Sequence, residues 1–296
     1  MERRPGEPVD RLFAFYALLS GIALVFPGRP DGWHVLVGLH ALAAFIGFGA
    51  APAVRSWNRI AGLWPRAARV VADWYPLVLV PALYTELAVL NRSVHGGRYF
   101  DSTILRWEEA VFGGQPSRTW AAAAPSLALS EVLHAAYLSY YILIYVPPLI
   151  LYARGRRTDF RLCVFVLMLT FFAHYLFFIY FPVQGPRYLF PAPDGIVATG
   201  FFYALAHRVL EAGSSQGAAF PSSHVGVAVT QTLLIGRVMR ALVVPAALLT
   251  VGLALGAIYG GFHYATDVVL GAGLGVLAVL VGPRLYLRLS HAGPAP

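Results

Sequence analysis

Residues 217–224 read GAAFPSSH and residues 259–267 read YGGFHYATD, and two apolar segments of helix length lie between them. Pro221 suits the first turn of a helix. The Ser222 and Ser223 amides are then among the unpaired donors of a helix N-terminus, where an anion such as phosphate binds. His263 and Asp267 are four residues apart, so they share one face of a helix that begins near them. The 217–224 and 259–267 segments therefore both indicate a reaction at a phosphate group.

The side chains of this stretch suit phosphate chemistry. A carboxylate at Asp267 fixes the tautomer of the His263 imidazole and makes it a better nucleophile. His224 follows the expected anion-binding amides, where a protonated imidazole can donate a proton to a leaving oxygen. Simpler alternatives are a structural histidine at a helix start and a polar pair that caps a helix. A metal site formed by His224, His263 and Asp267 is a third, less favoured because the adjacent serines suit an oxyanion better than a cation.

The composition predicts an integral membrane protein. The 296 residues are 58% hydrophobic and 12% charged, with a mean hydropathy of +0.65, which is too apolar for a soluble domain. The net charge of +8 comes from 22 arginines, and the sequence contains no lysine. Because these arginines form short clusters between apolar segments, we expect no nucleic-acid partner. The single cysteine, Cys163, excludes a disulfide within the chain and a cysteine metal cluster.

Apolar runs predict an all-α bundle of about eight transmembrane helices, or seven if a short run does not cross. No repeat and no low-complexity linker divides the chain, so we expect one domain over residues 1–296, with its catalytic motifs in 180–280. The N-terminal run has no convincing cleavage site and is expected to be a retained first span. The predicted spans are 12–27, 33–53, 74–93, 131–153, 159–182, 222–239, 241–261 and 266–286.

The arginines predict how the helices are oriented. In the eight-span arrangement 15 of the 22 arginines fall on one side, which the positive-inside rule makes the cytoplasmic one. Both termini are then cytoplasmic, whereas the 183–221 and 261–266 loops lie together on the outer face of the cell membrane. The 15 arginines are Arg3, Arg4, Arg11, Arg55, Arg59, Arg66, Arg69, Arg154, Arg156, Arg157, Arg161, Arg237, Arg240, Arg284 and Arg288.

Several polar residues stand outside the two motifs. Arg187 directly follows the fifth span, where its guanidinium can hold phosphate oxygens or, alternatively, a lipid head group. Residues 99–112 alternate apolar and charged side chains as an interfacial amphipathic helix does. Four ionisable residues within apolar runs should face the protein interior, where they bond to other helices or contact a head group. They are Glu86, Glu131, His134 and His174. Glycines at 271, 273 and 275 indicate close helix packing.

The chain resembles the type 2 phosphatidic acid phosphatase superfamily over about residues 180–280. That family has three motifs: Lys-x6-Arg-Pro, Pro-Ser-Gly-His and Ser-Arg-x5-His-x3-Asp. The second matches Pro221-Ser222-Ser223-His224 with serine for glycine, and the third matches through His263 and Asp267. Two departures remove cations. Gly256-Ala257 stands in place of Ser-Arg, and Tyr180 and Tyr188 stand in place of lysine and proline, leaving Arg187. The pattern is similar to the phosphotransferase branch that includes inositol phosphorylceramide synthases.

This resemblance implies a two-step transfer through a phosphohistidine. His263 attacks phosphorus, Asp267 orients it, and His224 protonates the leaving alcohol and then activates the acceptor. Arg187, Ser222 and Ser223 hold the phosphate oxygens. No metal or other cofactor is implied. The expected substrate is a lipid phosphate or a phospholipid, and the acceptor is water or a lipid hydroxyl. Two alternatives are a transporter or lipid-binding protein that keeps the fold without catalysis, and a metal-dependent membrane hydrolase.

Overall fold

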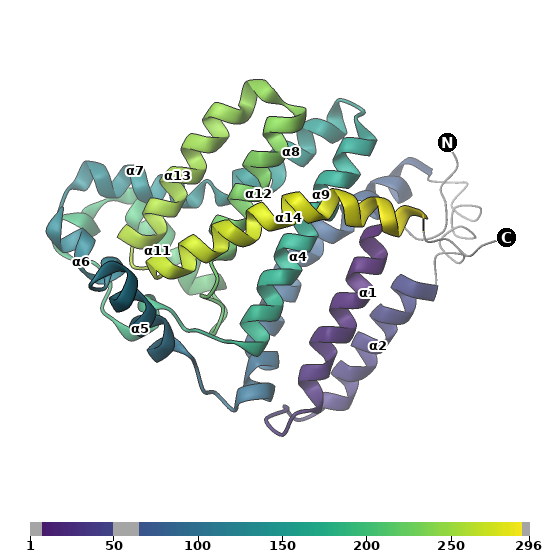
Figure 1. Ribbon diagram of the computed structural model, residues 1–296, viewed down its shortest axis with the longest axis horizontal. Coiled ribbons are helices and arrows are strands. Elements are labelled where there is room, and N and C mark those ends of the chain that lie inside the picture. Colours follow the sequence, from purple (N-terminus) through teal and green to yellow (C-terminus); the bar gives the residue numbers. More distant parts are fainter. Residues whose placement is uncertain (1–7, 50–64, 292–296) are drawn as a thin grey trace.

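The computed structural model describes residues 8–49 and 65–291, and these fold into helices joined by short loops (Figure 1). Among the described residues there is no β-strand, only one isolated bridge between Val183 and Ala218. The all-α prediction is therefore confirmed for the described part of the chain. The α-helices are α1 (Pro8–Gly21), α2 (Trp33–Gly49), α4 (Pro65–His95), α5 (Asp101–Phe112), α6 (Pro116–Ala123), α7 (Leu127–Leu138), α8 (Tyr140–Ala153), α9 (Arg157–Tyr180), α10 (Pro186–Leu189), α11 (Phe201–Gly213), α12 (Ser223–Val238), α13 (Val243–Tyr259) and α14 (Ala265–His291). Short 3-10 turns, η1 (Ile22–Val25), η3 (Gly195–Thr199) and η4 (Arg240–Leu242), join some of them.

Five described helical segments are long and apolar enough to cross a membrane, and a sixth results if α7 and α8, bent by 42°, form one span. The predicted count of about eight spans is not confirmed. Each predicted run overlaps helical structure in its described part, but the 131–153 run is divided between α7 and α8, α2 has only 17 residues and α12 only 16. At 1.5 Å per residue α12 is about 24 Å long, shorter than the ~30 Å hydrocarbon core. Ser222, which precedes α12, and Ser223, its first residue, are buried within the protein, so the helix does not begin at the membrane surface.

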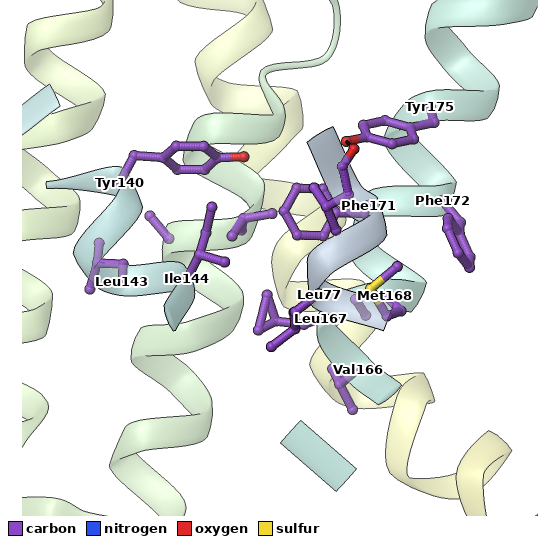
Figure 2. Packing of buried hydrophobic residues seen from close by; sticks show 14 of the residues in the cluster. Leu77, Tyr140, Leu143, Ile144, Val166, Leu167, Met168, Phe171, Phe172 and Tyr175 are labelled. Carbon is purple, nitrogen blue, oxygen red and sulfur yellow. Dashed lines mark hydrogen bonds between the residues drawn. The ribbon is translucent and has the colours of Figure 1, made fainter. Parts of the chain in front are cut away.

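Helix α9 lies at the centre of the bundle. Most of its length is buried, and it packs against α1, α4, α8, α12 and α14. Figure 2 shows part of this core, with side chains of α8 facing those of α9 and α4. Tyr140 of α8 stands at the edge of this apolar cluster, and its ring lies 4.3 Å from the His224 ring. The hydrophobic core thus ends where the polar residues of the motifs begin.

Helices α12 and α14 approach each other through glycine. A Cβ atom on Gly271 would overlap the Ser222 carbonyl oxygen, and one on Gly275 would overlap the Gly226 carbonyl oxygen. Small residues allow two backbones to pack this closely, which is the main source of helix association in a membrane. Close packing is therefore confirmed at Gly271 and Gly275. Gly273 has no atom within 4 Å of its Cβ position, so at this residue the expectation was wrong.

The arginine-rich segments lie at one end of the bundle and the motifs at the other. Arg11 at the start of α1 donates to the Leu289 carbonyl near the end of α14, at 3.0 Å. Arg156, before α9, donates to the Val238 carbonyl at the end of α12, at 2.6 Å. Since α12 and α14 both begin at the motifs, the motifs lie at the opposite end from these arginines. Of the other arginines in the topology argument, Arg3, Arg4, Arg55 and Arg59 lie outside the described residues.

Candidate active site

The His263 ring is held by two acceptors on one of its nitrogens. Its Nδ1 atom lies 3.0 Å from the Ala219 carbonyl oxygen and 3.5 Å from Asp267 Oδ2. A carbonyl oxygen only accepts hydrogen bonds, so Nδ1 must carry the proton. Nε2 then keeps its lone pair and is the nitrogen available for attack. The predicted role of Asp267 in fixing the tautomer is shared with the Ala219 carbonyl, which no sequence pattern could indicate.

Asp267 also caps helix α14. Its Oδ2 atom accepts a hydrogen bond of 2.9 Å from the Tyr264 amide, three residues earlier, as in a capping box. The side chain is completely buried, and its Oδ1 atom has no hydrogen-bond partner among the described residues. The same carboxylate therefore caps α14 and lies against His263 Nδ1.

The N-terminus of α12 differs in one detail from the sequence-based expectation. Ser222 is the N-cap and α12 begins at Ser223, so Pro221 precedes the cap instead of lying in the first turn. The Ser222 amide donates to the Asp267 carbonyl oxygen at 2.9 Å, and its hydroxyl accepts from the Val225 amide. The prediction that the Ser222 amide is a free anion-binding donor is therefore wrong. The amides of Ser223 and His224 have no acceptor within the described part of the chain.

His224 faces His263 across the site, with 5.5 Å between the ring centroids. Its Nε2 atom lies 3.3 Å from the Tyr137 hydroxyl, and its ring stacks on Tyr137 and contacts Tyr140. Its Nδ1 atom is buried and has no partner among the residues described. The structure thus brings the two histidines of the separate motifs together, each with one nitrogen left for a reacting group.

Arg187 is fixed to helix α11 through one nitrogen. The Nη1 atom donates to the Leu210 carbonyl at 3.1 Å and to the Ser214 hydroxyl at 2.7 Å. Neither Nη2 nor Nε has a hydrogen bond to a described residue. The segment before it is joined to the α12 approach by the Val183–Ala218 bridge, in which the Val183 carbonyl accepts from the Ala219 amide at 3.0 Å. Arg187 therefore belongs to the same end of the bundle as both histidines, with two donor groups free.

Comparison with known proteins identifies the family. Residues 102–281 match a family model described as PAP2 superfamily, and they make up more than half of the chain. The chain belongs to the PAP2 superfamily. No curated protein and no solved structure matches it. PAP2 membership indicates phosphatase-type or phosphotransferase-type chemistry on a membrane-associated substrate. It does not distinguish the branch that includes inositol phosphorylceramide synthases.

The departure of this PAP2 chain from the third motif has a packing explanation. A Cβ atom on Gly256 would overlap the Leu133 carbonyl oxygen of α7, so α7 packs too closely for the motif's serine. Ala257 is completely buried, and its carbonyl oxygen accepts from the Phe262 and His263 amides at 3.0 Å each. Where the family motif places Ser-Arg, this chain therefore has a close contact between α13 and α7 and a carbonyl oxygen that accepts two hydrogen bonds from the turn containing His263.

Two further histidines, His134 of α7 and His207 of α11, lie near the PAP2 site. His207 packs 5.2 Å from Phe262 and 4.1 Å from Tyr203, measured between ring centroids. Burial, together with the neighbouring His134 and Arg187, lowers the pKa of His207 to about 4. His207 is therefore neutral near pH 7 and adds no positive charge beside Arg187. Within the described residues, no group of three His, Cys, Asp or Glu side chains is arranged to hold a metal ion.

A cavity of about 450 Å³ adjoins the site. Its wall includes Gly261, two residues before His263, and Pro186, next to Arg187. The other side is formed by α6 and the 190–197 segment, which contribute Ser117, Arg118 and Asp194 among others. The Ser117 hydroxyl is buried and has no partner among the described residues, whereas Arg118 lies 4.1 Å over the Phe190 ring. The cavity thus contains cationic, anionic and hydroxyl side chains next to the turn that contains His263.

The four ionisable residues expected in the interior bond to other parts of the protein. Glu86 of α4 pairs with His40 of α2 at 3.6 Å. Glu131 Oε1 accepts from the Phe202 and Tyr203 amides at the start of α11, at 2.8 and 3.3 Å. His134 and His174 face carbonyl oxygens of their own helices, those of Ser130 and Thr170, at 2.7 Å each. Glu131, His134 and His174 are thus hydrogen-bonded within the protein, and Glu86 forms an ion pair with a neighbouring helix.

Two acidic residues of α5 reach the site, which sequence reasoning missed. Asp101 and Glu108 are 6% and 0% exposed, although the sequence pattern assigned both to the polar face of a surface helix. Burial raises the pKa of Glu108, while hydrogen bonds from Thr266 lower it in part. The available signal was their spacing: residues i, i+3 and i+7 share a helix face, which groups both acids with the apolar Ile104.

Proposed function

We propose that the chain is an integral membrane enzyme that transfers or hydrolyses the phosphate of a lipid phosphate or phospholipid through a phosphohistidine. His263 is the nucleophile, Asp267 orients it, and His224 is the general acid and base. Arg187 and the Ser223 and His224 amides hold the phosphate oxygens. The reaction takes place at the extracytoplasmic face, and both termini are cytoplasmic.

One observation carries this proposal. The Nδ1 atom of His263 is directed to the Ala219 carbonyl and Asp267, so Nε2 is the nitrogen oriented for attack, and the second histidine lies 5.5 Å away. This is the arrangement of a nucleophile held by a third group with a proton donor opposite. A histidine that merely stabilised the fold would need no second, partly unpaired histidine across an anion-binding helix terminus.

The chemistry balances in two steps. In the first, the Nε2 lone pair forms a bond to phosphorus, the bond from phosphorus to the leaving alkoxide breaks, and the oxygen takes a proton from His224. In the second, the acceptor gives its proton to His224 and attacks phosphorus, and the phosphorus–nitrogen bond breaks. With water as acceptor, a lipid phosphate gives free phosphate and a phospholipid gives its phosphorylated head group. With a lipid hydroxyl as acceptor, the same phosphoryl group is transferred to give a new phosphorylated lipid. Charge that spreads over the equatorial oxygens faces Arg187 and the free amides of α12.

The orientation is supported by the separation of arginines and motifs. Arg11 and Arg156 bond to the far ends of the two helices that begin at the site. Positive residues concentrate on the cytoplasmic side of membrane proteins, so the site at the other end is extracytoplasmic. Cysteine placed at the exposed position 212 in a Cys163→Ala background should react with an impermeant thiol reagent on intact cells, and labelling at position 156 instead would reverse the orientation.

The cavity beside the site bears on the substrate. Its volume of about 450 Å³ falls in the range of small-molecule pockets. A bare phosphate needs less space than this, whereas a polar head group would fill it. We therefore favour a phosphotransferase similar to inositol phosphorylceramide synthases over a simple phosphatase. Ala121→Trp, which fills the cavity, should then raise the KM for substrates with a large head group and leave that for a small phosphate ester unchanged.

Purified protein incubated with lipid phosphates and phospholipids tests the proposal. Free phosphate and new lipids are measured by mass spectrometry, and acid-labile phosphoprotein is trapped by rapid quenching. A phosphoprotein that forms in the wild type and is absent in His263→Ala is the expected result. Lipid binding or transport that survives His263→Ala, with no product of either kind, would favour the non-catalytic alternative. Loss of activity with a chelator would favour the metal-dependent one.

A further inference from the structure

Helix α5 is amphipathic in the opposite sense to an ordinary surface helix. Its acidic residues Asp101 and Glu108 face the protein and are buried, whereas Trp107, Val111 and Phe112 are 42%, 67% and 43% exposed. Charged side chains are almost never fully buried without partners, and clustered exposed apolar residues indicate an interaction surface. Both faces of α5 therefore need an explanation.

The Asp101 carboxylate joins the Arg187 segment to the His263 turn. Its Oδ1 atom accepts from the Gly185 amide at 2.9 Å and from the Tyr264 hydroxyl at 3.1 Å. Its Oδ2 atom accepts from the Gln184 amide at 3.0 Å. Gly185 lies two residues before Arg187, and Tyr264 directly follows His263. One carboxylate thus connects the expected phosphate-binding arginine with the expected nucleophile.

The Glu108 carboxylate holds the other side of the same turn. Its Oε1 atom accepts from the Thr266 amide at 3.0 Å and from the Thr266 hydroxyl at 3.1 Å. Thr266 precedes Asp267, which caps α14 and orients the His263 ring. The Oε2 atom is buried and makes no hydrogen bond to a described residue. Only one oxygen of Glu108 is therefore used, in contrast to both oxygens of Asp101.

The exposed face of α5 continues the lipid-facing surface of α14. The two helices pack against each other, and Val269 and Leu270 in the first turns of α14 are 60% and 42% exposed. Tryptophan is favoured at the boundary between head groups and hydrocarbon, and the exposed Arg106 and Glu109 beside it suit the head-group layer. The occupant that fits this face is the surface of the membrane that the bundle crosses.

We propose that α5 is a membrane-seated clamp: Trp107, Val111 and Phe112 enter the lipid surface, and Asp101 and Glu108 are positioning residues that hold the Arg187 segment and the His263–Asp267 turn together. This inference rests on the proposed function for its catalytic consequence, because it assumes that Arg187 and His263 act on one phosphate. Its structural part, the two carboxylate clasps and the lipid contact, does not depend on the reaction.

Conservative variants test the clasps. Glu108→Ala should lower kcat by about 10²-fold with little change in KM, because small displacements of reacting groups cost that much. Glu108→Gln should remain within about 3-fold of the wild type, since an amide oxygen still accepts both Thr266 hydrogen bonds. Asp101→Asn should lose about 10-fold, because its NH2 group faces a donor where Oδ2 accepted. Glu109→Ala, on the exposed side of the same helix, is the matched control. Equal losses in Glu108→Gln and Glu108→Ala would overturn the clasp.

Hydrogen exchange gives a measure independent of activity. In Glu108→Ala the amides of residues 264–268 should exchange faster while those of the distant α8 stay unchanged. If Glu108→Ala does not reach the membrane, the Glu108→Gln and Asp101→Asn pair still decides the matter. Absence of phosphoprotein in the wild type would reject the proposed function, whereas unchanged exchange in residues 264–268 would reject the clamp.

A nitroxide at position 111 tests the lipid contact. Val111→Cys in a Cys163→Ala background is labelled and reconstituted in phosphatidylcholine vesicles. Relaxation should be enhanced by oxygen, which concentrates in lipid, more than by a water-soluble nickel chelate. The same label at position 109 should show the reverse preference. A water-exposed label at position 111 would reject the membrane-seated face.

Discussion

Helices α12 and α14 both begin at the site, but their N-termini are occupied differently. At α14 the Tyr264 amide is bonded to Asp267 and the Thr266 amide to Glu108, so carboxylates satisfy its first turn. At α12 the Ser222 hydroxyl caps the Val225 amide, whereas the Ser223 and His224 amides have no acceptor among the described residues. The partial positive charge of a helix N-terminus is thus neutralised in one case and available in the other.

This difference bears on the proposed reaction. Carboxylates already satisfy the first turn of α14, so of the two helix starts α12 is the one with amides free to bind the phosphate of that reaction. The two starts are joined directly, because the Ser222 amide donates to the Asp267 carbonyl oxygen. In the proposed reaction the carboxylates at the start of α14 orient the nucleophile, and the free amides at the start of α12 face it.

The largest effect should separate the two histidines. His263→Ala should abolish the phosphoprotein, because the nucleophile is lost. His224→Ala should slow its formation by about 10²–10⁴-fold for a lipid phosphate and much less for a nitrophenyl phosphate, whose leaving group needs no proton. Rapid-quench measurement of phosphoprotein compares both variants with both substrates. Equal recovery of the two variants with nitrophenyl phosphate would remove His263 from the role of nucleophile.

The next largest effect should follow from removing the Arg187 guanidinium, which lies at the same end of the bundle as the start of α12. Arg187→Gln should lower kcat/KM by about 10²–10³-fold, as removal of one oxyanion donor does. Arg208→Gln on the exposed side of α11 is the control with the same charge change and should stay near the wild type. Steady-state rates of phosphate release and lipid product formation measure both. Comparable losses in the two variants would mean that overall charge matters rather than the Arg187 donors.

A smaller effect should follow from separating the two helix starts. Gly271→Ala places a methyl group against the Ser222 carbonyl oxygen, and overpacking of this kind costs about 1–3 kcal/mol of the free energy of unfolding. Gly273→Ala, two residues further along α14 in open space, should change stability by less than about 0.5 kcal/mol. Thermal unfolding in detergent compares them. A similar loss in both variants would show that helix propensity, not the α12 contact, dominates.

The smallest effect concerns the pH dependence of stability that arises from Glu108 at the start of α14. Burial raises the pKa of Glu108, so the folded state binds the proton more tightly than the unfolded state does. Stability should therefore fall as pH rises from the unfolded value of about 4.3 through the raised folded value. Glu108→Gln should lack this slope, whereas Glu109→Gln should keep it. Unfolding in detergent between pH 4 and pH 8 measures the difference, and identical slopes in all three proteins would exclude Glu108 as its source.

Prediction from the sequence succeeded where local pattern and chemistry coincide. The described part of each apolar run is helical, with a bend between α7 and α8 in one of them, and the two motifs meet at one end because α12 and α13 are of similar length and return the chain to it. It failed where a contact depends on a distant backbone. The Ser222 amide was expected to be free, but the glycine contact with α14 brings it to the Asp267 carbonyl. The acids of α5 were expected to face water because amphipathicity does not show which face meets the protein.

The sequence by itself determined that this is a helical membrane protein, and it predicted His224, His263, Asp267 and Arg187 as the residues of its active site. The first follows from composition and the second from short motifs, which are local properties. Only the tertiary structure decided which His263 nitrogen is free, which helix start is open, and that Asp101 and Glu108 reach the site. Those facts depend on hydrogen bonds between residues about 80 to 160 positions apart, for example Gly185 with Asp101 and Tyr264 with Asp101, and on Ala219 with His263. Such partners have no periodic signal, because only the packed bundle brings them together.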